Sequence, residues 1–383
     1  MENMKTREFK YDLLRLTAMF FVIVAHFFSS SNWIMNVAPN QAGPLNAAIC
    51  STMVMLGQVG VSLFLIISGY FLYSNKNPSP FGRIAKLELE TLSYSIPLLF
   101  LFIALLGLKA INESWRELLS IEVVLKSAFP ITRYTYWFIS SYCAVILFSP
   151  YLIFIIKMMN IKQTRFFMTH VILVFFIWKL INPFSQYSTD FTYAMILFLT
   201  GCCIRKRKQE CSSVNPTKHL LISLVYILIC FLATSLLYSY QDALARWGYW
   251  PYMLICGTGS IPLFSLLCAR ELFLAVDAWN TDNSPRQLQK IVLGLSPGVL
   301  GVYLIHTHPL ISPILWAHVF ATPEPIGAIN KIGYSLIACV LIYASMLIGS
   351  NLWVRFISER LKKKLSGPLS QIDKLAASLF PSN

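Results

Sequence analysis

Arg15 and His26 are ionisable residues inside an apolar stretch, residues 7–33, that is long enough to cross a bilayer. Ionisable groups are costly in hydrocarbon, so those that occur tend to face a protein interior or a wet cavity and to mark function. A histidine can accept a proton near neutral pH, and an arginine can bind and orient an anionic group. The two residue types together therefore indicate proton transfer beside a bound anion.

On one helix these two side chains would share a face. At about 100° per residue, the eleven steps between them come to roughly three turns plus 20°, and His26 lies roughly 16 Å deeper than Arg15. Asp12 lies three residues before Arg15, where it can pair with the guanidinium and orient it. Two simpler interpretations remain open: a boundary arginine that reaches the lipid headgroups, and a histidine that bonds to a neighbouring helix.

The composition is that of a polytopic membrane protein. Of 383 residues, 56% are hydrophobic and 13% are charged, whereas an ordinary globular chain has about 25% charged residues. The mean hydropathy is +0.61. The net charge of +14 could suggest nucleic acid, but the basic residues lie between apolar runs rather than on a soluble face. We therefore expect membrane lipids, and no nucleic acid, among the partners.

Ten apolar runs have about the length that a helix needs to cross the membrane. The fold class is predicted to be all-α, a single bundle of about ten transmembrane helices in one integral-membrane domain over residues 1–383. No connection is long enough for a separate soluble domain, although the segment from Trp115 to Lys126 could form an interfacial helix. The expected spans are 13–30, 50–73, 89–109, 134–157, 166–182, 190–205, 219–240, 251–275, 292–320 and 330–356, the ninth interrupted by Pro297, Pro309 and Pro313.

The distribution of lysine and arginine predicts the orientation of this bundle. With both termini in the cytoplasm, 24 of the 31 basic residues lie on the inside. This bias agrees with the positive-inside rule, because basic flanks resist translocation. The seven residues left on the outside are Lys109, Arg116, Lys126, Arg133, Lys179, Arg246 and Lys331.

Polar residues gather at both ends of the predicted bundle. Ser68, at the inner end of the second span, and Arg83 and Lys86, at the start of the third, are expected at one cytoplasmic mouth. Cations there suit a phosphorylated donor. For Arg83 and Lys86, a topology signal without a ligand is an equally open interpretation. For Ser68, which precedes Gly69, helix packing is equally open. At the outer face Trp137 begins the fourth span, where it fits an aromatic belt or a ring that stacks on a sugar.

Neither a metal site nor a disulfide framework is expected. The nine cysteines include no CxxC pair, lie mostly in apolar runs and are typical of small core residues. His306 and His308 are two residues apart and would point to different helix faces, so a shared metal is not expected. His170 and His219 lie at span ends close to the cytoplasm, where we expect them to be solvated.

Five segments in order resemble motifs of the acyltransferase 3 family of membrane acyltransferases. They are Asp12-Leu13-Leu14-Arg15 with His26, "GQVGVSLFLIISGYFLY" (57–73), "FGRIAKLE" (81–88), "RYTYWFISSYCAVILFSPYL" (133–152) and "LGVYLIHTHPLI" (300–311). Two departures stand out: Ser62 occupies a position where the family often has proline, and Lys86 replaces a second arginine. The resemblance is greatest to stand-alone members of the type that acetylates enterobacterial common antigen.

This resemblance implies an O-acyltransferase of the bacterial plasma membrane. It would move an acyl group, acetyl by expectation, from cytosolic acyl-coenzyme A as donor substrate, with no bound cofactor, to a hydroxyl of a surface or lipid-linked glycan. The implied roles are catalysis for His26 and Arg15, orientation of Arg15 for Asp12, donor binding for Arg83, Lys86 and Ser68, and acceptor binding for Trp137, Tyr303 and His306. The alternative is a transporter or flippase for a glycan or lipid intermediate, with His26 and His306 lining its route.

The orientation can be tested by single-cysteine labelling in a cysteine-free background. Cysteines at either terminus and at position 208 should be protected from a membrane-impermeant thiol reagent added outside intact cells, and a cysteine at position 40 should be labelled. Labelling of position 208 from outside would contradict the predicted orientation.

Overall fold

The computed structural model describes residues 8–30, 44–75, 79–178, 189–210, 215–246, 263–319, 328–364, 367 and 371. Every regular element within these ranges is a helix, so the all-α prediction is confirmed. Seven described helical runs are long and apolar enough to cross a membrane, and the chain is a multi-pass membrane protein. They are α1 (Phe9–Ser30), α3 (Pro44–Tyr73), α4 (Pro80–Gly107), α6 (Trp137–Met158), α10 (Pro216–Ser239) and the runs Arg286–His306 and Ile332–Leu361.

Three other expected spans coincide with helices that are not among these seven. Residues 166–182 and 251–275 lie partly outside the described residues, and their described parts are shorter helices. Residues 190–205 form a continuous helix whose C-terminal end is strongly charged. These helices are α7 (Ile161–Ile172) with the π-helix η3 (Leu173–Ile177), α9 (Asp190–Glu210) and α13 (Leu263–Ala278). The total of ten spans therefore stays a prediction.

The described helices divide into two compact units that alternate along the chain. Unit 1 contains residues 1–74, 151–296 and 321–343, and unit 2 contains residues 75–150, 297–320 and 344–383. Two of the division points fall inside α6 and inside α17 (Ala328–Trp353). The expectation of one integral-membrane domain over the whole chain stays a prediction beside this division.

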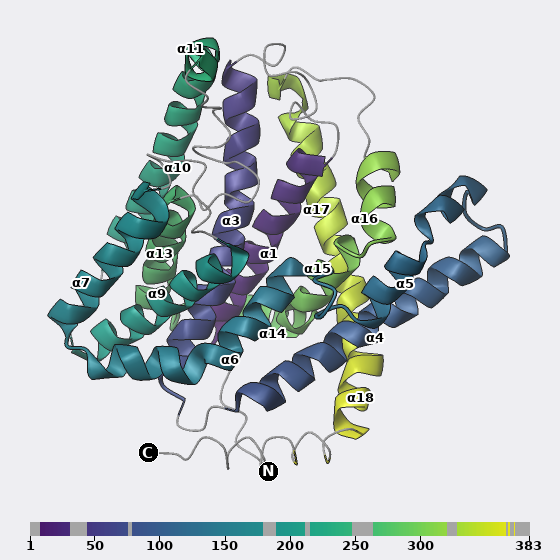
Figure 1. Cartoon of the computed structure of the whole chain (residues 1–383), viewed down its shortest axis with the longest axis horizontal. Helices are drawn as coiled ribbons and strands as arrows, with labels where there is room; N and C mark the ends of the chain where they lie inside the picture. Colours follow the sequence, from purple (N-terminus) through teal and green to yellow (C-terminus); the bar gives the residue numbers. More distant parts are fainter. Residues whose placement is uncertain are drawn as a thin grey trace. The chain divides into compact units, whose positions relative to one another are not determined.

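In unit 1, α1 and α3 lie side by side with their backbones in close contact (Figure 1). Two glycines of α3 make the contact possible. A Cβ added at Gly57 would overlap the side chain of Ala25, and one added at Gly60 would overlap the carbonyl oxygen of Ala18. Small residues allow this approach in a membrane, where packing replaces the hydrophobic effect between helices. The rotation and depth of α1 are thereby fixed against α3.

The other side of α3 contacts α9 in the same way. A Cβ at Gly69 of α3 would overlap the carbonyl oxygen of Phe198, and a Cβ at Gly201 of α9 would overlap the carbonyl oxygen of Ile66. Each helix therefore contributes one glycine to a reciprocal backbone contact. Gly69 therefore has a packing role. This agrees with the interpretation of its segment as a helix-packing site.

A buried lysine of α9 completes the C-terminal end of α6. The Lys206 side chain is 6% exposed, and its ammonium donates to the carbonyl oxygen of Ile156 at 2.6 Å and to that of Met159. The last carbonyls of a helix have no partner within the helix, and a cation is favoured near them. The lysine therefore belongs to the architecture of unit 1.

Unit 2 contains the break that the prolines of the ninth span predicted. The helix that begins at Arg286 passes through a 3-10 turn, η4 (Ser296–Gly298), continues as α15 (Val299–His306) and ends there. After the Pro309 turn, the chain resumes as α16 (Ile311–Ile314) and the π-helix η5 (Leu315–Val319). The ninth span is thus two helices rather than one.

The segment between α4 and α6 is helical, as expected for the interfacial element. It forms η2 (Glu113–Leu118) and α5 (Ile121–Ala128). Trp115 and Val123 pack against a small apolar core in unit 2 that includes Phe102 and Leu310. The element is therefore anchored by its apolar side chains.

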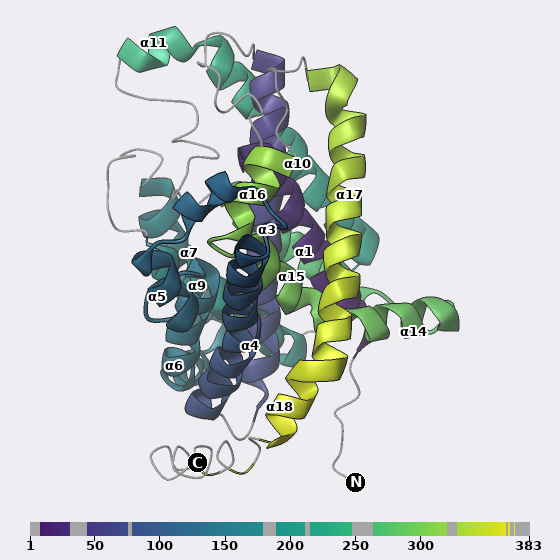
Figure 2. The same ribbon diagram turned by 90° about the vertical axis from the view of Figure 1, so that its right-hand side faces the viewer.

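The remaining described helices are short and lie at the ends of longer ones. In unit 1, α14 (Arg286–Leu295) lies crosswise to α3 (Figure 2). It is amphipathic, since Ile291 is 57% exposed and the adjacent Val292 is 4% exposed. The others are α11 (Gln241–Arg246), the π-helix η6 (Val354–Ser358) and α18 (Glu359–Lys364).

The α3–α9 contact predicts a strong effect of a single methyl group. Gly69→Ala should lower the midpoint of thermal unfolding in detergent by several degrees, because overpacking a close contact costs about 1–3 kcal/mol. Gly349→Ala in α17 is the matched control, since a Cβ there would meet nothing within 4 Å. Its midpoint should stay unchanged or rise, because alanine is the better helix former. Equal melting of the two variants would contradict the packing argument.

Candidate active site

The first turn of α1 holds the Asp12 and Arg15 pair in unit 1. Arg15 Nη1 donates to Asp12 Oδ1 at 2.5 Å, and the Asp12 side chain is fully buried. Ser296, which follows α14, donates from its hydroxyl to Asp12 Oδ2 at 3.0 Å. A buried carboxylate needs such partners to offset its lost hydration. The Arg15 side chain, which is 33% exposed, is therefore held in one orientation.

His26 lies on the same helix as Arg15. Its side chain is half-buried between the fully packed Ala25 and Phe27. Ala25 is the residue against which Gly57 of α3 packs, so the close α1–α3 contact lies directly beside the histidine. The unbroken helix keeps the spacing that places Arg15 and His26 near one face.

Ser68 and Tyr70 lie near the C-terminal end of α3. The Ser68 hydroxyl donates to the carbonyl oxygen of Phe64 at 2.8 Å, one turn earlier in the same helix. Tyr70 is 1% exposed, and its hydroxyl oxygen lies 3.5 Å from that of Tyr11 on α1. The C-terminal end of α3 therefore meets the first turn of α1, one turn from Arg15.

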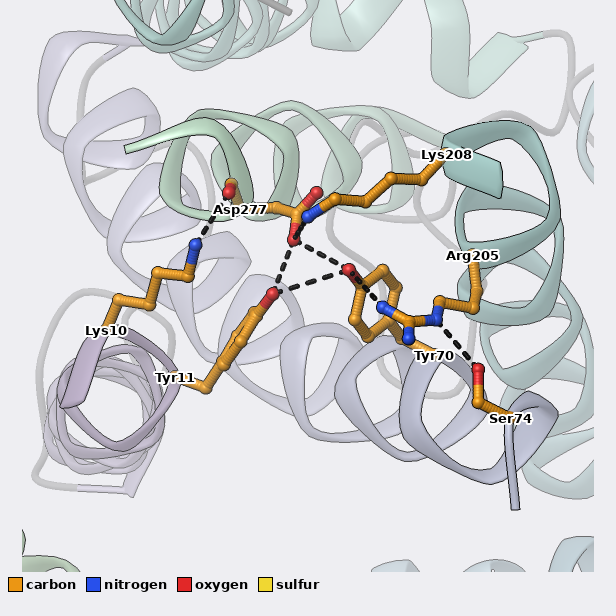
Figure 3. A network of polar contacts seen from close by, with 7 residues as sticks. All are labelled: Lys10, Tyr11, Tyr70, Ser74, Arg205, Lys208 and Asp277. Atoms are coloured by element: carbon orange, nitrogen blue, oxygen red, sulfur yellow. Dashed lines mark hydrogen bonds and ion pairs between the residues drawn. The ribbon is translucent and has the colours of Figure 1, made fainter. Parts of the chain in front are cut away.

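Asp277 is the centre of a polar network at these helix ends, which the sequence reasoning did not identify (Figure 3). Its Oδ1 accepts hydrogen bonds from Tyr70 at 2.8 Å, from Lys208 at 2.8 Å and from Tyr11. Asp277 lies beyond the predicted span 251–275. Burial opposes its ionisation, but hydrogen bonds from Lys208 and two tyrosines outweigh burial and lower the pKa of the carboxyl below its usual value.

Two further cations complete this network. Arg205 donates from Nη1 to the Tyr70 hydroxyl at 2.9 Å and from Nε to the Ser74 hydroxyl at 2.7 Å. Lys10 donates to the backbone carbonyl of Asp277 at 2.8 Å. Four helices of unit 1, namely α1, α3, α9 and α13, are therefore joined at one end (Figure 3). The sequence signal that could have identified this network is an acidic residue, Asp277, directly after an apolar run.

A third buried carboxylate, Glu271, corrects the expectation for His219. His219, near the start of α10, bonds through Nδ1 to Glu271 of α13, whose other oxygen pairs with Arg270. The His219 side chain is 20% exposed, so it is a paired group rather than a solvated one. His170 is exposed at the end of α7, as expected.

In unit 2, Arg83 and Lys86 lie at the start of α4. The helix is capped by Ser79, whose hydroxyl accepts from the backbone N–H of Gly82 at 3.3 Å. Both cations are exposed and lie three residues apart, so they share one side of the first turns. A helix N-terminus carries partial positive charge, which adds to their attraction for an anion.

Also in unit 2, Tyr303 and His306 belong to an aromatic cluster. The Tyr303 ring centroid lies 5.8 Å from that of Phe138 and 5.9 Å from the His306 ring, and the Trp137 ring is next to Phe138 at 6.2 Å. Trp137 is half-buried, whereas Tyr303 and His306 are buried. The structure therefore connects Trp137 to Tyr303 through Phe138.

The two histidines of the ninth span take different roles in unit 2. His306 bonds through Nδ1 to the carbonyl oxygen of Val302 at 2.6 Å, so in the neutral ring Nδ1 carries the proton and Nε2 is the basic nitrogen. His308 accepts from the backbone N–H of Leu310 through Nδ1 and donates from Nε2 to the carbonyl oxygen of Ser95 at 3.3 Å. His308 is therefore a structural residue at the break after α15.

The described residues contain neither a cluster of metal ligands nor a disulfide. Within them, no group of three or more His, Cys, Asp or Glu side chains has the arrangement of a metal site. The seven cysteines of those ranges are free thiols, and all but Cys203 are buried.

A comparison with protein families gives one match. A family model described as an acyltransferase domain, that of the acyltransferase 3 family, matches residues 9–348. No curated protein and no solved structure matches the chain. The match covers most of the chain and includes all the candidate residues of both units.

Proposed function

Because the chain belongs to the acyltransferase 3 family and is thus a membrane acyltransferase, we propose that it transfers acetyl from cytosolic acetyl-coenzyme A to a glycan hydroxyl. The acceptor is a surface or lipid-linked glycan, and the enzyme resides in the bacterial plasma membrane. The observation that carries the proposal is the α1 arrangement, in which Asp12 fixes Arg15 on the helix that also bears His26.

The reaction requires a base and a group that holds the donor. His26 takes the proton of the acceptor hydroxyl while the hydroxyl oxygen attacks the thioester carbonyl carbon. The C–S bond then breaks, and the thiolate of coenzyme A receives the proton from the imidazolium, so no net proton is consumed. Arg15 orients the donor and favours the developing negative charge on the carbonyl oxygen. Its fixed orientation avoids reorganisation during the reaction.

The donor and acceptor meet different residues in this proposal. Arg83 and Lys86, exposed beside the N-terminus of α4, bind donor phosphate, and Ser68 lines the donor route in unit 1. Trp137 and Tyr303 supply aromatic faces for the sugar, and His306 contributes a nitrogen that can accept a hydroxyl proton in a hydrogen bond.

The transport alternative makes a different biochemical demand. A transporter or flippase needs no thioester, whereas the acyltransferase releases free coenzyme A from acetyl-coenzyme A only when an acceptor glycan is present. Purified protein should therefore give acceptor-dependent thiol release. Glycan translocation without thiol release would contradict the proposal.

The role of Arg83 predicts a defect in donor binding. Arg83→Ala should raise the KM for acetyl-coenzyme A more than the KM for acceptor, because a lost phosphate contact mainly weakens ground-state binding. Arg165→Ala, which removes an exposed arginine of α7, is the control and should leave both constants unchanged. An unchanged donor KM in Arg83→Ala, at normal protein levels, would reject the contact.

The role of His26 predicts a loss of turnover without loss of fold. His26→Gln keeps hydrogen-bonding groups but cannot act as a base at neutral pH, so turnover should fall roughly 10²-fold or more. Binding of acetyl-coenzyme A and membrane insertion should persist. His170→Gln, at an exposed position in α7, is the matched control and should be fully active. Near wild-type acetylation by His26→Gln would show that the histidine only packs.

A further inference from the structure

The polar network at the inner ends of α1, α3, α9 and α13 has more positive than negative side-chain charge. It contains one carboxylate, Asp277, and three cations, Lys10, Arg205 and Lys208 (Figure 3). Lys208 forms the ion pair with that carboxylate at 2.8 Å. The other two cations donate to neutral oxygens, namely a backbone carbonyl, a phenol and a serine hydroxyl.

The remaining acidic side chains described nearby on these helices do not balance the excess. On α1, Asp12 is paired with Arg15, and on α13, Glu271 is paired with Arg270. Glu8, directly before α1, is exposed. Among the residues that the structure describes, Glu8, Lys10 and Arg205 form no ion pair. The network therefore carries two positive charges in excess of its own carboxylate.

Two of the three cations, Arg205 and Lys208, lie over the same aromatic ring and can be reached from solvent. The Arg205 guanidinium carbon lies 4.8 Å, and Lys208 Nζ lies 5.8 Å, from the centroid of the same Tyr70 ring. The Lys208 side chain is 46% exposed. Arg205 donates through Nε and Nη1, which leaves further N–H groups of its guanidinium for a ligand. Like charges this close repel each other, and a bound anion relieves that repulsion.

We propose that Arg205 and Lys208, with Lys10, form a binding site for a phosphate ester. A phosphate monoester carries about two negative charges at pH 7, which matches the excess of the network. Under the proposed function, on which this assignment rests, the ester belongs to the acyl-coenzyme A donor. Coenzyme A has a diphosphate and a separate phosphate monoester, so it offers a phosphate ester of the kind that these cations would bind.

A structural role for the cations is the competing explanation. They lie at the carboxyl ends of α3, α9 and α13, where partial negative charge favours cations. Under that explanation, removing Lys208 would change stability but not the affinity for a phosphate ester. The two explanations also differ in the effect of removing the negative charge of Asp277.

The test is equilibrium binding of coenzyme A to the purified full-length protein in neutral detergent. Lys208→Met should weaken binding about tenfold, the scale of a lost charge-assisted hydrogen bond. Arg207→Met is the matched control, because it removes an exposed cation from the adjacent position, outside the network, and should leave the affinity unchanged. Asp277→Asn should retain or tighten binding, since it removes the competing negative charge.

The outcomes separate this site from the proposed function and from a lipid ligand. Absence of coenzyme A binding to the wild-type protein would refute the donor assignment. Equal affinities of Lys208→Met and Arg207→Met would overturn the donor-phosphate site even if Asp277→Asn fails to fold. In nanodiscs, loss of selective phosphatidylglycerol retention over phosphatidylcholine by Lys208→Met, with unchanged coenzyme A affinity, would assign the phosphate ester to a lipid headgroup instead.

Discussion

The backbone contacts of α3 with α1 on one side and α9 on the other constrain the candidate residues that these helices carry in unit 1. Lipid tails are as apolar as leucine, so helices in a bilayer gain little from burying apolar side chains against each other. Close packing at glycines supplies the attraction instead, and Gly60 and Gly69 permit it on the two sides of α3. Because α1 has one rotation relative to α3, Arg15 and His26 each have one direction in which to point.

Two buried carboxylates use this fixed frame at the inner helix ends. Asp12 and Asp277 would be strongly destabilising without partners, because a buried charge loses its hydration. Their partners come from other parts of the chain: Ser296 for the first, and Lys208 and Tyr70 for the second. The contact at Gly69 brings α9, and with it Lys208, against α3, so packing and polar pairing stabilise the same arrangement. The orientation of Arg15 is a consequence of both.

The sequence alone predicted the features that depend on local composition. Apolar length gave the all-α membrane fold, the prolines gave the break after His306, and three-residue spacing brought Asp12 to Arg15. The fifth and eighth expected spans are covered only in part by described helices. Asp277 was not identified, because its role depends on Tyr11 and Tyr70, which lie more than 200 residues away in the chain. Glu271 was not identified for the same reason. Because its contact with His219 was not predicted, His219 was expected to be solvated.

Residue type alone also did not distinguish the roles of His306 and His308, whereas their packing does. His306 and His308 have the same chemistry in sequence, but their Nδ1 atoms have opposite roles, donor in one and acceptor in the other. The backbone break between them causes this difference, because Leu310 turns its N–H toward His308. No helical periodicity contains that information.

The contact of Lys206 of α9 with the end of α6 has a consequence for the biogenesis of the protein. The carbonyl groups near Ile156 receive their donor from Lys206, 50 residues later in the chain. During synthesis α6 therefore emerges from the ribosome before α9, with the inner terminus of α6 still dependent on water or headgroups for its hydrogen bonds. That terminus is completed only when α9 inserts beside it. The order of translation thus makes α9 the element that closes this part of unit 1, and a nascent chain ending before it would be a natural substrate for membrane quality control.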